Sequence, residues 1–64
     1  MLNTEHSYYE AGYKAGRARR QRDESRAQFH TNWFHRARGL EQPEDKDYAR
    51  KLFDQGYAEG RGTV

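Results

Sequence analysis

The residues best suited to chemistry in this sequence are basic side chains concentrated in its middle. Residues 14–38 carry eight bases and two acids, and all but one of these bases are arginine. An arginine guanidinium binds phosphate or carboxylate oxygens through paired hydrogen bonds. The eight bases are Lys14, Arg17, Arg19, Arg20, Arg22, Arg26, Arg36 and Arg38. The stretch predicts a surface that binds RNA or an acidic protein. The alternative is a solvated helix face that pairs with acids of the last helix.

Two aromatic side chains lie close enough to the arginines to belong to the same surface. Trp33 and Phe34 follow Arg26 and precede Arg36. Rings interleaved with cations can stack on unpaired bases, as recognition of single-stranded RNA requires. The competing interpretation is that both rings belong to the hydrophobic core. The sequence leaves these two interpretations open.

Other kinds of chemistry have little support. The chain has no cysteine, and His30 and His35 miss the i, i+4 spacing that places two metal ligands on one helix face. It contains no nucleophile motif, no glycine-rich phosphate loop after a strand and no spaced pair of carboxylates in a predicted pocket. We therefore expect a protein that is not an enzyme and that uses no cofactor and no metal.

Size and composition favour a single small helical domain over residues 1–64. Only 33% of the residues are hydrophobic, many of these are aromatic, and the chain has one valine and no isoleucine. Because strands favour β-branched residues, this composition predicts an all-α fold with a core of rings and alanines. No secretory signal and no membrane-spanning run of about 20 apolar residues is visible. We expect a cytoplasmic protein without a membrane partner.

A ten-residue pattern near the start of the chain returns near its end. Residues 8–17 and 52–61 share two glycines, a tyrosine and an arginine at equivalent positions. On a helix, the aromatic and glycine positions form one stripe of alternating large and small side chains. Glycine costs up to about 1 kcal/mol relative to alanine inside a helix, so two in each copy favour close approach of another backbone. The competing interpretation is that the second glycine of each copy only ends a helix.

The repeated stripes predict that the first and last helices pack on each other, within one chain or across the two-fold axis of a homodimer. Small domains without disulfides often gain stability from association, which keeps the dimer open. The residues expected in this contact are Tyr9, Gly12, Tyr13, Gly16, Leu52, Phe53, Gly56 and Tyr57.

Capping signals set the expected helix boundaries. Ser7 with Glu10 fits a capping box, and Ser25 with Gln28 fits a second one. Residues 7–38 therefore form either one long helix or two. The sequence thus predicts two to three helices, over about residues 7–22, 25–38 and 44–60.

Two residues after the predicted helix 25–38 indicate where it ends and where the next helix begins. Gly39 is suited to end a helix, and Pro43 is suited to the first position of the next one. Within the middle segment, the spacing predicts an apolar stripe with Phe34 beside it. The stripe consists of Phe29, Trp33, Ala37 and Leu40.

Two segments resemble the helices of the bacterial ribosome modulation factor family. Residues 12–20, with a Gly-Tyr-x-Ala-Gly start followed by small and basic residues, are similar to the family's first helix. Residues 53–59 are similar to its second helix. The resemblance implies a small basic protein that binds ribosomal RNA and protein on the small subunit and favours inactive ribosome dimers. The chain departs from the family between the helices, where Glu44 rather than an aromatic residue follows Pro43 and residues 25–38 are additional.

Two functions are expected from these features. The first is a small RNA-binding protein, in the ribosome-associated class of regulators, that contacts phosphates through the net charge of +6 over residues 14–38. The alternative is a protein-interaction module or inhibitor, of the kind that phages encode. Such a module would dimerise through the glycine and aromatic faces and bind an acidic protein.

Overall fold

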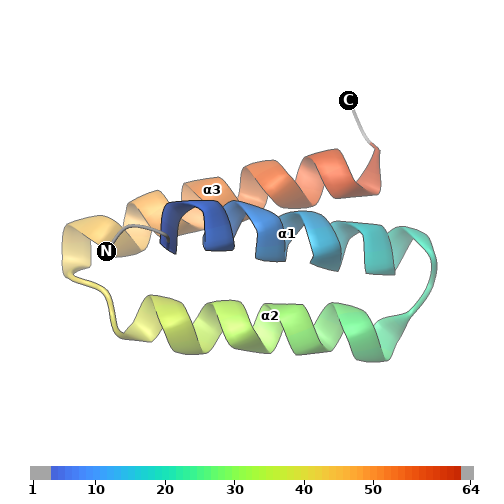
Figure 1. Cartoon of the computed structure of the whole chain (residues 1–64), viewed down its shortest axis with the longest axis horizontal. Helices are drawn as coiled ribbons and strands as arrows, with labels where there is room; N and C mark the ends of the chain where they lie inside the picture. Colours follow the sequence, from blue (N-terminus) through green and yellow to red (C-terminus); the bar gives the residue numbers. More distant parts are fainter. Residues whose placement is uncertain (1–3, 63–64) are drawn as a thin grey trace.

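Three helices account for nearly all of residues 4–62, the part of the chain that the computed structural model describes (Figure 1). α1 spans Thr4–Arg20, α2 spans Glu24–Gly39 and α3 spans Pro43–Arg61. The all-α prediction is confirmed, since residues 4–62 contain no strand. The chain turns back twice, so α1 and α3 run in the same direction and α2 runs against both.

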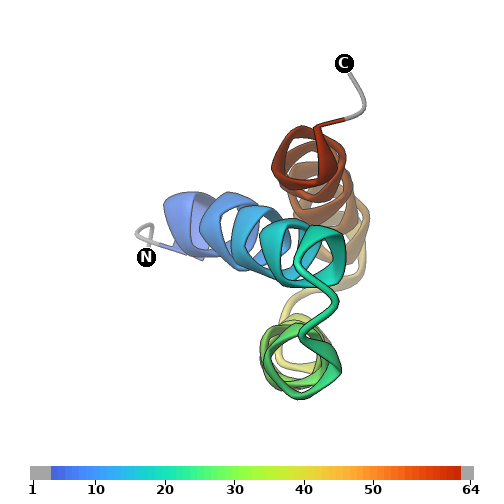
Figure 2. The same cartoon turned by 90° about the vertical axis from the view of Figure 1, so that its right-hand side faces the viewer.

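α1 lies between the other two helices, as the view along the bundle shows (Figure 2). Its contact with α3 is the most extensive in the molecule, its contact with α2 comes next, and α2 and α3 touch least. α1 therefore buries two faces. The Tyr8 ring packs against rings of α2, whereas Gly12 and Gly16 meet the backbone of α3.

Residues 7–38 form two helices, and the break falls at residues 21–23. The Asp23 amide donates to the Ala18 carbonyl at 2.8 Å, and the Arg22 amide donates to Arg19 at 3.0 Å. This pair of bonds is the Schellman ending of a helix. Arg22 takes the left-handed position with φ of 62°, where glycine is the usual residue. The predicted end at residue 22 is therefore two residues late.

Both predicted capping boxes are wrong. α1 already includes Thr4, so Ser7 lies inside the helix rather than at its start. α2 is capped by Asp23, whose carboxylate accepts a bond from the Arg26 amide at 3.1 Å, and Ser25 is the second helical residue. Asp is as good an N-cap as Ser, and the Schellman ending of α1 delivers Asp23 at that place. The end of α2 at Gly39 and the start of α3 at Pro43 are confirmed.

The core is built of rings and alanines, as the composition predicts. Phe34 of α2 stacks on Phe53 of α3 with ring centroids 4.1 Å apart, and the Tyr8 ring meets Phe34 edge-on at 6.0 Å. Small alanines let the helices approach around these rings. The buried alanines are Ala11, Ala15, Ala18, Ala27 and Ala49.

The inward face of α2 differs from the predicted stripe. Phe29 and Leu40 are 64% and 89% exposed, whereas Ala27 and Phe34 are buried. Trp33 and Ala37 are partly buried at the edge of the core. The helix is turned so that Phe34 rather than Phe29 points inward, because Phe34 is the ring that finds a stacking partner in Phe53.

The repeated glycines lie where α1 and α3 cross. A methyl group at Gly12 would overlap the Phe53 carbonyl oxygen and lie 2.8 Å from its carbon. At Gly56, the equivalent methyl group would overlap the Tyr9 carbonyl oxygen and lie 2.9 Å from the Tyr13 nitrogen. The two copies of the pattern thus meet reciprocally, in a geometry that also favours weak Cα–H···O contacts between helices.

The second glycine of each copy also lies against the backbone of the other helix. Gly16 faces the Tyr57 carbonyl, and Gly60 faces the Tyr13 carbonyl. Gly60 is buried inside α3, and the helix is capped by Gly62 with φ of 76°. The interpretation of Gly60 as a helix end is therefore wrong. Since these faces are covered within the chain, they are not open to a second copy in this fold.

Candidate nucleic-acid interface

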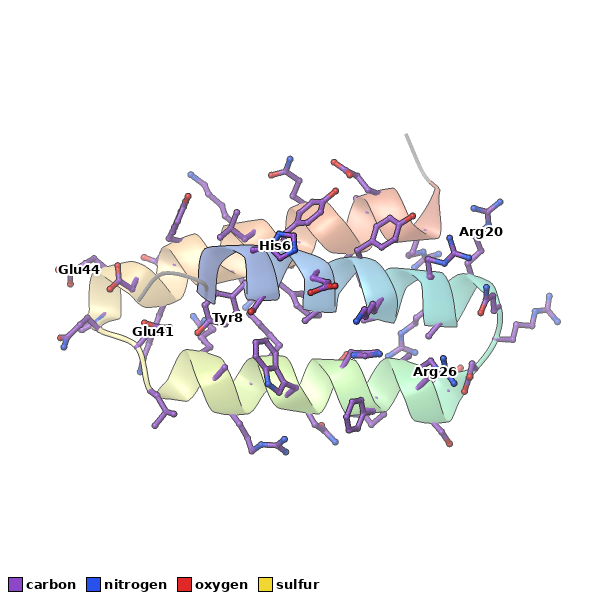
Figure 3. All side chains as sticks on the ribbon, viewed as in Figure 1. His6, Tyr8, Arg20, Arg26, Glu41 and Glu44 are labelled. Atoms are coloured by element: carbon purple, nitrogen blue, oxygen red, sulfur yellow. The ribbon has the colours of Figure 1, made fainter. Side chains whose placement is uncertain are left out.

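Arginines from three helix ends gather at one end of the bundle. Three of them occupy the last turn of α1, one lies in the connection to α2, one lies in the first turns of α2, and one ends α3. They are Arg17, Arg19, Arg20, Arg22, Arg26 and Arg61. We call these six residues the basic end. Figure 3 labels two of them, Arg20 and Arg26, on the same side of the molecule.

Acidic side chains gather at the opposite end of the bundle, beside the bases in the last turn of α2. Glu44 and Asp45 lie in the first turn of α3, where the positive end of the helix dipole stabilises them, and Glu41 precedes that helix. Glu41 and Glu44 lie at the far end of the molecule from Arg20 and Arg26 (Figure 3). The net positive charge is therefore concentrated at one end of the long axis, whereas acids and bases are mixed at the other end.

Three of the predicted basic residues lie outside the basic end. Lys14 lies about one turn before Arg17 in α1. Arg36 and Arg38 lie in the last turn of α2, at the opposite end of the bundle. The Arg38 Nε donates to the Lys46 carbonyl of α3 at 3.0 Å. Because α2 runs against α1, the arginines at its C-terminus are carried away from those of α1. The prediction that residues 14–38 share one basic surface is wrong for this pair.

Phe34 is also wrongly assigned as a binding residue. Its side chain is 4% exposed and stacks on Phe53, so no base can reach the ring. Trp33 is half-buried against Tyr8, with ring centroids 5.8 Å apart, and leaves part of its indole open. The core interpretation holds for Phe34, and Trp33 borders both the core and the surface.

An open groove follows the boundary between α1 and α2 and leads into the basic end. It consists of adjoining hollows, three of which share His30. Toward the basic end the lining residues are cationic, and toward the middle they are aromatic. We define the α1–α2 groove by the side chains Lys14, Arg17, Arg26, Phe29, His30 and Trp33.

Phe29 and His30 are absent from the sequence-based set of binding residues. The Phe29 ring contacts the His30 ring edge-on, with centroids 5.2 Å apart. Phe29 could have been found from its spacing to Arg26, since residues three apart share a helix face. The apolar stripe predicted for α2 assigned the same ring to the core instead.

The groove carries more positive than negative charge. Lys14 pairs with Glu10 at 3.5 Å, and Arg26 pairs with Asp23 at 3.5 Å. The pKa of His30 is lowered, first by partial burial and then by the nearby charges of Lys14 and Arg26, with Glu10 opposing them. Partial burial is thus the main cause of the depressed pKa of the His30 imidazole, and the two nearby cations add to it.

Most of the basic end lacks a carboxylate partner. Arg19 pairs with Glu24 at 3.1 Å. Arg17 lies over the Tyr13 ring at 6.0 Å, and Arg61 repeats this over Tyr57 at 5.8 Å. Among residues 4–62, no carboxylate of α3 forms an ion pair with the basic end. The predicted pairing with acids of the last helix is therefore not present among these residues, whereas the arginines of the basic end are exposed to solvent.

Residues 6–62 hold no group of three or more His, Asp or Glu side chains that could bind a metal ion. None of the described helices is both long and apolar enough to cross a membrane. No protein family, curated protein or solved structure matches this chain. The function is therefore inferred from the surface itself.

Proposed function

We propose that this protein binds RNA through its phosphates, using the basic end as the contact surface. The observation that carries the proposal is the convergence of six arginines from three helix ends at one end of a very small molecule. Neutralised phosphates release condensed counterions, and this release drives binding of nucleic acid to clustered cations. An arginine fork also matches the geometry of a phosphate group.

The availability of the guanidinium groups supports the same conclusion. Arg20 and Arg22 are exposed, and no carboxylate among residues 6–62 pairs with either. The two paired arginines, Arg19 and Arg26, form solvent-exposed ion pairs with the nearby Glu24 and Asp23. Exposed ion pairs are worth only about 0–1 kcal/mol, so a phosphate can displace them at little cost.

The resemblance to the ribosome modulation factor family points to ribosomal RNA as the target. The matched first segment, residues 12–20, contains three arginines of the basic end and Lys14 of the groove. In the structure its glycines face α3, and its arginines lie at the end of α1. The glycines would then hold the helix in place while the arginines contact ribosomal RNA.

The proposal is tested with two variants of equal charge change. In the first, Arg17, Arg20 and Arg26 are replaced by Gln at the basic end. In the second, Arg36, Arg50 and Lys51 are replaced by Gln elsewhere on the surface. Circular dichroism checks that both fold. We expect the first variant to lose at least tenfold in affinity for RNA, and the second to stay close to the unchanged protein.

The outcome also distinguishes RNA from an acidic protein as the partner. Equal losses in the two variants would mean that only net charge matters. Poly-glutamate competing as well as RNA of the same charge would favour an acidic protein on the basic end. Co-purification from lysate with and without RNase gives the independent check, since ribosomal components lost on RNase treatment are expected here.

A further inference from the structure

Phe29 is an exposed aromatic ring that the core does not explain. It is 64% exposed, while the other two phenylalanines, Phe34 and Phe53, are buried. Its one close ring contact is with His30, edge-on, which leaves a ring face toward solvent. Exposing a ring of this size forgoes roughly 1.5–3 kcal/mol of burial, so a contact outside the folded chain is the natural counterpart.

The surroundings of Phe29 specify the chemistry of that contact. The ring lines the α1–α2 groove beside His30, and Arg26 lines the hollow that Phe29 and His30 share. The next hollow, which also includes His30, is lined by Lys14 and Arg17. A ligand in the groove therefore meets cations on one side and a flat apolar surface on the other. A nucleotide fits this arrangement, because its phosphate suits the cations and its base, joined to the phosphate through the ribose, suits the apolar surface.

We propose that single-stranded RNA lies along the α1–α2 groove, with an unpaired base stacked on Phe29 and its phosphates on Lys14, Arg17 and Arg26. This inference rests on the proposed function and specifies that the RNA bound is unpaired. A base inside a duplex has both faces covered by its neighbours and cannot stack on a side chain. The groove therefore selects unpaired RNA over a helix of the same charge.

The other exposed apolar side chains lack this combination. Leu40 is 89% exposed and Tyr48 is 47% exposed, and they lie near the end of the bundle opposite the basic end. Neither side chain lines the α1–α2 groove, and Glu44 and Asp45 near them oppose the approach of phosphates. Leu40 is therefore a matched control for Phe29, since it is an exposed apolar residue on the same protein.

The test compares two RNA probes with three variants. The probes are a single-stranded 12-mer and a blunt-ended 12-base-pair duplex, which has no unpaired loop. The variants are Phe29→Ala, Phe29→Trp and Leu40→Ala. We expect Phe29→Ala to weaken single-strand binding by about 5- to 150-fold, the range that loss of one stacked base gives. Phe29→Trp should keep the affinity, and Leu40→Ala should leave it unchanged.

Failure of this inference is distinguishable from failure of the proposed function. If the unchanged protein binds neither probe at moderate salt, RNA binding itself is overturned. If it binds both probes equally and Phe29→Ala alters neither affinity, the basic end still binds RNA and the stacking site is overturned. Because Phe29 is exposed, Phe29→Ala is expected to fold, and its melting curve checks this directly.

Discussion

Arg22 is a non-glycine residue with a strained, left-handed backbone conformation. It occupies the left-handed position that ends α1, with φ of 62°. A side chain with a Cβ costs roughly 1–2 kcal/mol in this region relative to glycine. α3 ends in the same way but uses Gly62, with φ of 76°. The two helix ends therefore form a natural comparison.

We expect Arg22→Gly to raise the free energy of unfolding by about 1 kcal/mol, because glycine removes the strain at this turn. For a domain of this size that corresponds to roughly 4–8 °C in the melting temperature. Gly62→Ala should do the reverse, since its Cβ would be strained and would lie 3.0 Å from the Arg20 guanidinium. Thermal denaturation measures both, and a destabilised Arg22→Gly variant would contradict the account.

Tyr8 links the start of α1 to the connection before α3. Its ring is buried, with 3% exposure, and its hydroxyl donates to the Glu41 carboxylate at 2.6 Å. Burial raises the pKa of the Tyr8 phenol well above its ordinary value, and the bond to Glu41 raises it further. The folded protein therefore holds the neutral phenol more strongly than the unfolded chain does.

The raised pKa predicts a loss of stability in alkali. Because the unfolded phenol ionises near pH 10 and the folded one only at higher pH, the contribution is complete below about pH 10 and is lost above it. We expect Tyr8→Phe to reduce the fall of the free energy of unfolding above pH 10. At pH 7 the substitution should lower that free energy by about 1 kcal/mol, because the hydrogen bond to Glu41 is lost. Tyr48→Phe, at an exposed ring, is the control. Urea denaturation between pH 8 and 11 measures both variants.

At the scale of elements, the packing of α1 on α3 is decided by four glycines. Gly12, Gly16, Gly56 and Gly60 each face a backbone carbonyl of the other helix. The Tyr9 hydroxyl adds a hydrogen bond to Glu59 across the same contact. A backbone carbonyl cannot move aside as a flexible side chain can, so even one methyl group must push the helices apart.

Alanine at these positions should therefore destabilise the fold, although alanine is the better helix former. We expect Gly12→Ala and Gly56→Ala each to lower the free energy of unfolding by about 1–3 kcal/mol. A domain of this size has only about 3–10 kcal/mol in total, so the double variant should be largely unfolded. Chemical denaturation followed by circular dichroism measures the loss.

Gly39 provides the control for this series, because a methyl group there would meet nothing within 4 Å. Gly39→Ala should be neutral or slightly stabilising. The unchanged protein should also melt at a temperature independent of its concentration, since the glycine contact lies within one chain. A concentration-dependent melting temperature, lost in Gly12→Ala, would instead place this contact between two copies.

At the scale of the whole molecule, the bundle concentrates its net positive charge at one end of its long axis. The basic end and the acids around Glu41 and Glu44 lie at opposite ends of a molecule 33 Å long (Figure 3). Such a separation orients the protein as it approaches a polyanion, with the arginines leading. It also keeps the acids far enough from the bound phosphates to be screened at physiological salt.

This distribution of charge predicts how RNA affinity depends on salt. The logarithm of the affinity should fall linearly with the logarithm of salt concentration, by about 0.7 for each phosphate contacted by a single strand. Replacing Arg17, Arg20 and Arg26 by Gln should reduce this slope by about 2. Replacing Arg36, Arg50 and Lys51 should leave it nearly unchanged. Fluorescence anisotropy from 50 to 300 mM salt gives both slopes, and an equal reduction would contradict this distribution.

The amino-acid sequence by itself determined the local features of this protein. The scarcity of valine and isoleucine predicts helices, Gly39 and Pro43 mark the second turn, and the aromatic and alanine composition anticipates the core. The repeated glycine stripe also anticipates a close helix contact. Each of these follows from interactions within a few residues or from composition, which a sequence states directly.

Only the tertiary structure decided which faces meet and which remain open. Periodicity places Phe29 in the apolar stripe of the helix and Phe34 beside it, but stacking on Phe53 selects Phe34 for the core and leaves Phe29 in the groove. In the same way, the reversal of α2 carries Arg36 and Arg38 away from the other arginines. Contacts between distant segments set these outcomes, because a helix fixes the order of its faces and not the partner that each face finds.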